Sequence, residues 1–365
     1  MGFATTAAVL RDPRTEFNIE PVELDDLRAG EVLVRIQACG VCHTDSYAMS
    51  ALPVPSVLGH EGAGVIEQVG AGVRGFTPGD TVIVSYPSCG NCANCQTQRP
   101  FICEQIIDLK FKGCRNDGSQ PVRVGGGPIT SAFFQQSSFA RHAIALANNL
   151  IKVEPRWSPQ ILASLPCGVL TGVGTVVNIV KSQARRTLAV MGVGAVGMSA
   201  VMAARLVGLT DVAAIDVNPD RLSLAQDLGA KHTFNARDPD VERQIKTVYP
   251  TGLDYILDTS GNAVAIQSAI NCIAMGGELG LVTVPEPYPA AEAHLNQFFL
   301  RAGSLRCVIV GAADARIILP WLLERHARGI FPVERLIQTY PFADINRAFA
   351  DAKAGVAIKP VLLMS

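Results

Sequence analysis

The sequence predicts an α/β protein of two domains, one a mostly antiparallel β domain and the other a doubly wound parallel sheet. Three observations indicate this fold. The chain has 365 residues, which is too long for one typical domain. Residues 5–152 hold short apolar runs broken by Gly, Pro and Asp, as in many short strands joined by tight turns. Residues 157–311 alternate apolar strands with amphipathic stretches, the pattern of a parallel sheet covered on both faces.

The end of the chain is expected to complete the first domain. After Gly311 the sequence predicts two helices, ILPWLLERHARG and DINRAFADAKAG, and a last short strand, IKPVLLM. We therefore expect residues 1–167 and 310–365 to form the β domain, with residues 168–309 inserted as the parallel-sheet domain. The cleft between the two is the expected place for substrate and cofactor.

Charge and composition exclude several classes of partner. The formal net charge is −1 and no long run of Lys or Arg occurs, which disfavours nucleic acid and anionic membranes. Each apolar run is interrupted well before the roughly 20 residues that cross a bilayer, and MGFATTAAVLRDPRTEF lacks the pattern of an export signal. We expect a cytoplasmic protein whose partners are small molecules or further copies of itself. Its ten cysteines are then metal ligands and core residues rather than disulfides.

The stretch CGNCANCQTQRPFIC has the spacing of a closed metal site. Four thiolates spaced CxxCxxCx7C converge on one tetrahedral ion if the chain turns back on itself, which the Gly and Asn residues between them permit. This predicts a structural zinc site. An iron–sulfur cluster, or four cysteines without metal, are the alternatives. The predicted ligands are Cys89, Cys92, Cys95 and Cys103.

A second set of metal-binding side chains is spread along the first domain. Cys42, His60 and Cys167 occur in GVCHTD, GHEGAG and LPCGVLTG, and each is expected at a transition from strand to turn. Two thiolates and one imidazole leave the fourth position of a zinc ion open, as in a catalytic site. Cys39 is interpreted as a packing residue, since no thioredoxin-like strand and helix surround CGVC.

TLAVMGVGAVG predicts a dinucleotide site. Gly192, Gly194 and Gly197 form GxGxxG directly after an apolar strand, where they give a tight turn, a close approach of backbone to pyrophosphate, and close packing of the next helix. Asp216 ends the following strand about 20 residues later, where a carboxylate binds the adenosine ribose hydroxyls. A carboxylate there favours NAD over NADP. The alternative makes Asp216 a helix cap or a surface residue.

Five motifs in order give a family resemblance. GHEGAGVIEQVG, of the form GHExxGxxxxxG, together with GVCHTD, the four-cysteine stretch, CGVLTG and GVGAVG, resembles the zinc-dependent medium-chain alcohol dehydrogenases over essentially the whole chain. ACGVCHTD, SSFARHAIALANNLIKV and FADINRAFADAKAG look most like the aryl (benzyl) alcohol dehydrogenase branch. The resemblance implies a GroES-like catalytic domain, a Rossmann domain, two zinc ions per subunit, NAD, and a homodimer or homotetramer.

The activity that the resemblance implies is reversible hydride transfer between a primary aromatic or allylic alcohol and NAD, giving aldehyde and NADH. Thr44 is the expected first carrier of the proton, although it also suits a helix cap. His43 is expected to contact the pyrophosphate or to share the proton path. Tyr47 stands where many family members have a histidine that ends this path, so the proton is expected to leave through His43, through ribose and water, or more slowly.

Two acidic residues are expected near the catalytic zinc. Asp45 is expected to accept a hydrogen bond from His60, with a helix cap as the alternative. Glu61 either approaches the zinc during ligand exchange or forms an internal ion pair. The cofactor contacts that the resemblance implies are those of Thr171 with the nicotinamide, Arg221 near the ribose and Lys359 with the pyrophosphate, where Lys359 is otherwise a solvated charge.

Three segments of the chain are expected to determine which alcohol fits the substrate pocket. Residues 47–49, 106–112 and 295–299 are expected to line the pocket, and their apolar character suits a flat hydrophobic alcohol. A glutathione-dependent formaldehyde dehydrogenase, acting on the S-hydroxymethyl adduct, is the enzyme alternative and needs basic residues at the pocket mouth. Only Lys110, Lys112 and Arg115 offer these. The other alternative is a non-catalytic sensor that binds zinc and nucleotide.

Overall fold

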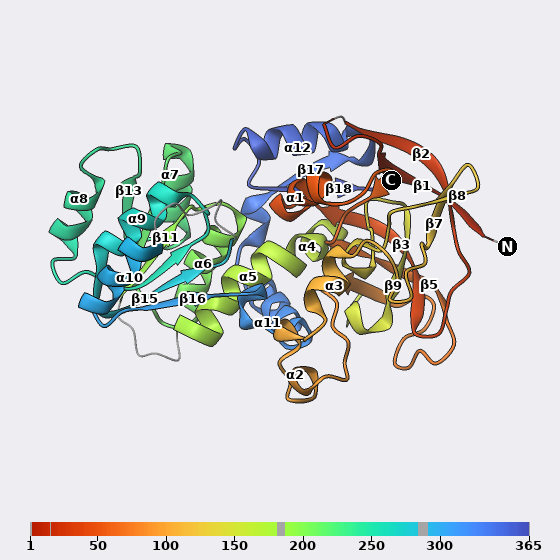
Figure 1. Ribbon diagram of the computed structural model, residues 1–365, viewed down its shortest axis with the longest axis horizontal. Coiled ribbons are helices and arrows are strands. Elements are labelled where there is room, and N and C mark those ends of the chain that lie inside the picture. The colour runs from red at the N-terminus through yellow and green to blue at the C-terminus, as the bar shows by residue number, and fades with distance from the viewer. Residues whose placement is uncertain (1, 15, 181–186, 284–290, 365) are drawn as a thin grey trace. The chain divides into compact units, whose positions relative to one another are not determined.

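The structure of the chain is a computed structural model that describes residues 2–14, 16–180, 187–283 and 291–364. It divides into two compact units, Met1–Cys167 with Asp314–Ser365, and Gly168–Ala313 (Figure 1). The domain limits expected from the sequence, 1–167 with 310–365 and 168–309, are kept as a proposal.

The first unit contains a five-stranded sheet in which every pairing is antiparallel. Its order is β4-β1-β2-β7-β8. Apolar side chains of these strands, among them Val9 and Val22, pack into one core with Leu33, Ala140 and Ile144. The strands are β1 (Phe3–Leu10), β2 (Phe17–Leu24), β4 (Ser56–Val57), β7 (Val122–Val124) and β8 (Gly127–Ile129).

A seven-stranded sheet supports the candidate site and includes the end of the chain. Its main path is β10-β6-β5-β3-β18-β17, and β9 also pairs with β3. The C-terminal strand β18 pairs antiparallel with β3, with Leu362 opposite Cys39, and only its pairing with β17 is parallel. The strands are β3 (Glu31–Gly40), β5 (Gly62–Val69), β6 (Thr81–Val84), β9 (His142–Leu146), β10 (Leu150–Val153), β17 (Ile337–Pro341) and β18 (Lys359–Leu363).

Short helices fill the connections of the first unit. The two helices predicted near the C-terminus are confirmed as α11 (Ala315–Ala327) and α12 (Ile345–Lys353). β17, which lies between these two helices in the chain, was not expected from the sequence. The remaining helices of this unit are α1 (His43–Ala51), α2 (Ala93–Gln96), α3 (Ile106–Phe111) and α4 (Pro159–Ser164).

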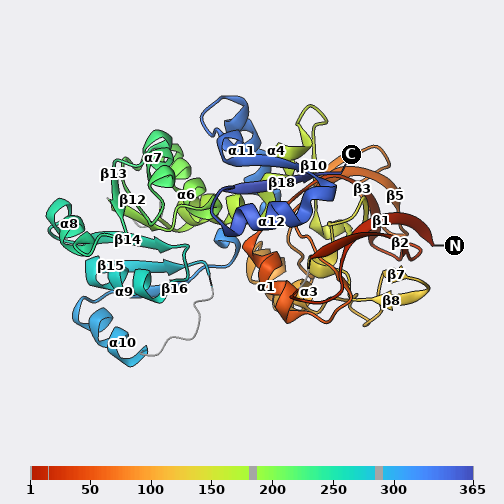
Figure 2. The ribbon, with the colours of Figure 1, turned by 90° about the horizontal axis from the view of Figure 1, so that it is seen from above.

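The second unit is the predicted doubly wound sheet. Its six strands are all parallel, in the order β13-β12-β11-β14-β15-β16, which reverses direction at β11. Figure 2 shows α6 and α7 on one face of the sheet and α9 and α10 on the other. The strands are β11 (Thr187–Met191), β12 (Asp211–Asp216), β13 (His232–Asn235), β14 (Leu253–Asp258), β15 (Ile273–Leu281) and β16 (Ser304–Cys307). The helices are α5 (Leu170–Gly174), α6 (Ala195–Leu206), α7 (Pro219–Leu228), α8 (Val241–Val248), α9 (Ala263–Cys272) and α10 (Ala291–Leu300).

A continuous helical stretch, Pro159–Val180, corrects two expectations. Within the described residues it is the one helix long and apolar enough to cross a membrane by length and composition, but 78% of its most apolar window is buried inside the protein, as in a core helix. The expectation that every apolar run is too short is therefore wrong here. Cys167 lies in a π-helical turn of this stretch, Leu165–Val169, and not at the end of a strand. A short apolar run such as LPCGVL fits a strand and a buried helix equally well.

Arg115 is a structural residue of the first unit. Its guanidinium binds Glu31 through Nε and Nη2, at 2.7 and 3.0 Å, and Asp25 through Nη1 at 2.9 Å. Arg115 and Glu31 are both buried. Because all three nitrogens are used, Arg115 does not provide a free charge for a substrate, and the expectation that it could is wrong.

We predict that Arg115→Met lowers the free energy of unfolding by about 3–5 kcal/mol, because the buried Glu31 carboxylate then has no counter-charge. Chemical denaturation measures this change. Arg123→Met is the matched control, since Arg123 binds the same Asp25 from an exposed position and its loss costs less than about 1 kcal/mol. Equal losses in both variants would contradict the assignment.

Candidate metal centre and cofactor site

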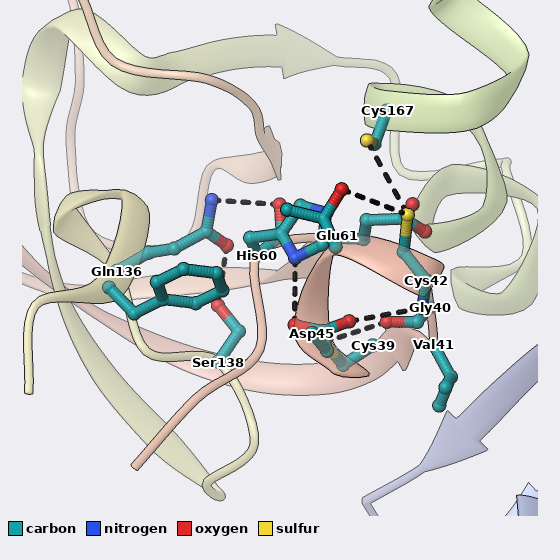
Figure 3. A network of polar contacts seen from close by, with 12 residues as sticks. Cys39, Gly40, Val41, Cys42, Asp45, His60, Glu61, Gln136, Ser138 and Cys167 are labelled. Atoms are coloured by element: carbon teal, nitrogen blue, oxygen red, sulfur yellow. Dashed lines mark hydrogen bonds and ion pairs between the residues drawn. The ribbon is translucent and has the colours of Figure 1, made fainter. Parts of the chain in front are cut away.

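Three predicted ligands from separate parts of the chain meet in the first unit. Cys42 directly precedes α1, His60 lies in the loop between β4 and β5, and Cys167 lies in the π-helical turn after α4. Ligand atoms of these residues and of Glu61 all lie within 4.8 Å of one another. Figure 3 shows the two sulfurs facing each other across the site.

The donor atoms fit a zinc ion. Four ligands at the corners of a tetrahedron with Zn–S bonds of about 2.3 Å place two sulfurs about 3.8 Å apart. The sulfurs of Cys42 and Cys167 are 3.8 Å apart. His60 is 1% exposed, and its Nε2 has no hydrogen-bond partner within the described part of the chain. A buried ring nitrogen without a partner is costly unless it binds a ligand, so the structure favours a metal here.

Asp45 orients the imidazole. Its Oδ1 lies 2.8 Å from Nδ1 of His60, and its Oδ2 accepts the backbone N–H of Cys42 at 3.0 Å. The first contact places the ring proton on Nδ1 and leaves the lone pair on Nε2 for a metal. The second contact closes the first turn of α1. Asp45 therefore serves in both expected roles, as the hydrogen-bond partner of the ligand His60 and as part of the helix cap.

The sulfur of Cys42 lies in surroundings that favour a thiolate. The hydrogen bond from the Cys167 thiol and the neighbouring His60 ring hold the pKa of Cys42 well below its usual range, against the opposing effect of burial. A thiolate is the form of cysteine that binds metals. The same hydrogen bond, together with burial, raises the pKa of Cys167, so Cys42 is the sulfur of this pair that is the thiolate before a metal binds.

Glu61 and Lys359 form a buried ion pair beside the ligands. The ammonium of Lys359 binds one carboxylate oxygen of Glu61 and lies 3.4 Å from the carbonyl of Val41. Burial raises the pKa of Glu61 to about 7 even with Lys359 alongside. Lys359 is 2% exposed, so the alternative of a solvated charge is wrong. Its contact with the pyrophosphate stays a prediction, as does the approach of Glu61 to the zinc.

A loop that the sequence analysis missed holds His60 in place. Gln136 donates from Nε2 to the carbonyl of His60 at 3.0 Å and accepts the N–H of Gly62 at 3.2 Å. The Phe134 ring lies 4.5 Å from the imidazole, centroid to centroid. The backbone of this loop is strained, since four of its non-glycine residues have positive φ: Ala132, Phe134, Gln135 and Ser137. Strained loops are common at functional sites. In the sequence, two adjacent glutamines in the run SAFFQQSSFA were the available signal for this loop.

The predicted proton carriers lie at the start of α1. The hydroxyl of Thr44 is 3.7 Å from the sulfur of Cys42. His43 is the first residue of α1 and its side chain is exposed. Tyr47, one turn further on, is 61% exposed and packs edge-on to Phe111, with ring centroids 6.1 Å apart. Thr44 is thus the member of this group nearest to a ligand.

The four-cysteine stretch closes into a second donor cluster. Its sulfurs all lie within 4.8 Å of one another, and those of Cys89 and Cys95 are 3.9 Å apart, close to the tetrahedral value. Backbone N–H groups of Cys92 and Cys89 donate to the sulfurs of Cys89 and Cys103 at 3.4 and 3.3 Å. A multi-iron cluster binds its sulfurs to different irons and holds them farther apart, so one zinc ion fits better.

The glycine-rich turn of the second unit has the geometry that the motif requires. Gly192 follows β11 with φ of +83°, and a Cβ on Gly197 would lie 2.1 Å from the carbonyl oxygen of Gly192. A Cβ on Gly194, directly before α6, would meet no atom within 4 Å. The first and third glycines are therefore required by the turn, whereas space at the second is open for a ligand at the helix N-terminus.

Asp216 ties this turn to the end of β12. Its two carboxylate oxygens accept the N–H groups of Val193 at 2.7 Å and Asn218 at 2.9 Å. Asn218, not Asp216, caps α7, so the reading of Asp216 as a helix cap is wrong. Arg221 lies in the first turn of α7 and Thr171 lies buried in α5. Their contacts with the cofactor, and that of Asp216 with the ribose, stay predictions.

The residues expected to line the substrate pocket lie in different surroundings in the structure. Tyr47 and Phe111 join a cluster of rings in the first unit that reaches His60 through Phe134. In the second unit, Phe298 packs into the core of the parallel sheet and Phe299 is exposed. The side chain of Leu295 lies outside the described residues.

Both parts of the chain match known protein families. Residues 28–155 match the alcohol dehydrogenase GroES-like domain, and residues 195–324 match the zinc-binding dehydrogenase domain. The chain is 41% identical to geraniol dehydrogenase of Castellaniella defragrans, over 98% of this chain and 97% of the relative.

Solved structures share the same architecture over their full length. The crystal structure of an alcohol dehydrogenase zinc-binding domain protein from Burkholderia ambifaria matches with a TM-score of 0.95 and 39% identity, and 100% of each chain is covered. The crystal structure of benzyl alcohol dehydrogenase from Acinetobacter calcoaceticus matches with a TM-score of 0.94 and 31% identity, again over 100% of each chain. The fold and the two donor clusters therefore agree with an oxidoreductase that acts on CH–OH groups.

We predict that substitutions of the second and third glycines separate stability from binding. Gly197→Ala forces a Cβ onto the carbonyl of Gly192 and lowers the free energy of unfolding by about 1–3 kcal/mol. Gly194→Ala has room for its methyl group, so stability stays within about 0.5 kcal/mol while affinity for NAD falls. Denaturation and NAD titration measure the two effects. Equal destabilisation by both substitutions would contradict the geometry.

We predict that Cys103→Ser removes one of two zinc ions per chain and lowers the melting temperature, since a structural zinc contributes directly to folding. Elemental analysis of the purified variant measures the loss. Cys114→Ser is the matched control, because Cys114 is also buried but belongs to neither cluster, and this variant keeps both ions. Two ions in the Cys103 variant would show that this cysteine is not a ligand.

Proposed function

The chain belongs to the zinc-dependent medium-chain alcohol dehydrogenase family, and we propose that it transfers hydride reversibly between a primary aromatic or allylic alcohol and NAD, giving aldehyde and NADH. The observation that carries this proposal is the convergence of two sulfurs and one unpartnered imidazole nitrogen around a single point. The fourth neighbour, Glu61, is paired through one oxygen with Lys359, and we assign the fourth position on the metal to an alcohol oxygen.

Zinc at this site would supply a charge that lowers the pKa of an alcohol and polarises the carbonyl of an aldehyde. The chain's own residues position it and move the proton. Asp45 keeps the His60 ring in the binding tautomer. The Thr44 hydroxyl, adjacent to Cys42, is suited to accept the alcohol proton and pass it to His43, whose exposed ring delivers it to water. Tyr47 packs against Phe111 and contacts none of the predicted ligands, so we assign it no part in this path.

NAD is proposed as the coenzyme of the second unit. The open space at Gly194 suits a pyrophosphate at the start of α6. The Asp216 carboxylate at the end of β12 repels a 2′-phosphate and suits free ribose hydroxyls. Gly192, Gly197, Thr171, Arg221 and Lys359 are proposed as the further residues of this site.

The substrate class is argued from the rings beside His60. Phe111, Phe133 and Phe134 lie with their centroids 4.8 to 6.0 Å apart, and Phe134 stacks on the imidazole in a tilted arrangement. Phe133 and Phe134 are buried, so the half-buried Phe111 is the ring of this group that can contact a flat apolar group. The relatives named for geraniol and benzyl alcohol act on allylic and aromatic primary alcohols, which agrees with this choice.

The arrangement of the basic residues argues against the alternative of a glutathione-dependent formaldehyde dehydrogenase. Arg115 is committed to Glu31 and Asp25, and Lys112 is exposed with its ammonium 3.5 Å from the carbonyl of Asn116. Lys110 is left as a single buried charge. A peptide adduct with several charges needs a group of cations at the mouth of the site, and these three residues do not supply one.

Self-association and location are proposed from two further features. β16 is the edge strand of the six-stranded sheet, and its residues are exposed, with Leu305 at 52%. An unpaired apolar edge suits a homodimer or homotetramer. All ten cysteines are free, which suits the reducing cytoplasm.

The proposed activity is tested by absorbance of NADH at 340 nm. We expect zinc-loaded enzyme to reduce NAD with benzyl, cinnamyl and other allylic primary alcohols, at higher kcat/KM than with straight-chain alcohols, and to lose the signal with a chelator. Cys114→Ser is the control that keeps the activity. No NADH from any alcohol would reject the dehydrogenase, and a signal with NADP alone would overturn the role of Asp216.

A further inference from the structure

Lys110 is a buried cation without an anionic partner. It lies near the end of α3 and is 7% exposed. Its ammonium forms no hydrogen bond or ion pair with any residue in the described ranges, but the nitrogen itself still reaches solvent. Its contacts are with two aromatic rings, whose centroids lie 5.7 Å away for Tyr86 and 5.4 Å away for Phe134.

This environment is unfavourable for a charge that serves only the fold. Burial lowers the pKa of Lys110 to about 8, so Lys110 is still charged in most molecules at pH 7. Buried charges in proteins are paired or bind a ligand, because desolvation of an unpaired ion costs several kcal/mol. Contacts with ring faces recover about 2 kcal/mol at most. The other two cations of this region are satisfied, Arg115 by carboxylates and Lys112 by solvent and a carbonyl.

Lys110 lies next to the metal centre. The same Phe134 ring whose centroid is 5.4 Å from the ammonium stacks on His60 at 4.5 Å. Two thiolates neutralise a Zn²⁺ ion, and Glu61 is neutralised by Lys359, so neither offers a net negative charge to Lys110. An anion from outside the described residues can therefore reach the ammonium, which water otherwise solvates.

We propose that Lys110 binds an oxyanion carried by the substrate, so that the preferred alcohols are aromatic or allylic alcohols with a carboxylate on the far side of the planar group. The apolar part of such a substrate lies against the half-buried ring of Phe111, its hydroxyl at the metal, and its carboxylate on the ammonium. This inference rests on the proposed function. It assigns Lys110 as a specificity residue for that reaction.

The experiment compares matched substrates. The zinc-loaded enzyme is assayed with 3- and 4-(hydroxymethyl)benzoate, with their neutral methyl esters, and with benzyl alcohol. In Lys110→Met, we expect kcat/KM for one or both carboxylates to fall roughly 10- to 100-fold, as for loss of a hydrogen bond to a charged group. Values for benzyl alcohol and the esters stay within about threefold or rise. Lys110→Arg, which keeps the charge, retains the preference for the carboxylate.

Calorimetry gives a second readout that does not need turnover. Binding of 4-formylbenzoate and 3-formylbenzoate to the enzyme with NADH weakens by the same factor in Lys110→Met, whereas binding of benzaldehyde does not. The methionine keeps the packing against Tyr86 and Phe134 and removes a buried charge, so the melting temperature stays equal or rises. Lys353→Met, at an exposed position of α12, is the matched lysine control and changes none of these values.

The outcomes separate the two proposals. If benzyl alcohol is oxidised but Lys110→Met alters carboxylates and esters alike, the inference about Lys110 is wrong and the proposed activity stands. If the carboxylates are no better than the esters for the unmodified enzyme, the inference is also wrong. If no alcohol is oxidised and the calorimetric preference still depends on Lys110, the binding role stands without the dehydrogenase.

Discussion

The hydrogen bond between Nδ1 of His60 and the Asp45 carboxylate is the interaction on which the metal centre depends. It directs Nε2 toward the two sulfurs, and the other oxygen of the same carboxylate fixes the backbone of Cys42. One buried side chain thus positions two ligands that come from different loops. Gln136 holds the backbone of His60 from the opposite direction. The zinc chemistry follows from this rigidity, since a ligand set needs fixed orientation to leave one position open.

Charge balance explains the surroundings of the site. Two thiolates match a dication, and the Glu61 carboxylate matches the Lys359 ammonium that β18 brings from the end of the chain. Each buried charge near the metal is therefore compensated, apart from Lys110. The same rule that makes Arg115 a structural residue makes Lys110 a candidate for substrate binding. Burial alone does not distinguish the two roles, but the presence or lack of a carboxylate partner does.

Chemistry that is local in sequence could be predicted, and chemistry that depends on distant contacts could not. The spacing of residues predicts two sites: a zinc site from four cysteines within fifteen residues, and a dinucleotide site from a glycine-rich turn after a strand. Cys167 was correctly predicted to join the ligand group but was placed at the end of a strand instead of in a helix. A short apolar run does not show whether its hydrophobic pattern has the period of a strand or of a helix. Lys359 and Glu61 are 298 residues apart, and no pattern in the sequence links them. The loop around Gln136 uses positive φ at non-glycine residues, which composition does not reveal.

Zinc X-ray absorption spectroscopy on the purified protein tests the central claim most directly. The account predicts two zinc ions per chain, one with four sulfur ligands and one with two sulfurs and lighter atoms. The average is then about three sulfur neighbours per zinc at about 2.3 Å, with nitrogen or oxygen at about 2.0–2.1 Å. One zinc per chain with four sulfur neighbours and no lighter ligand would contradict it, because Cys42, His60 and Cys167 would then bind no metal.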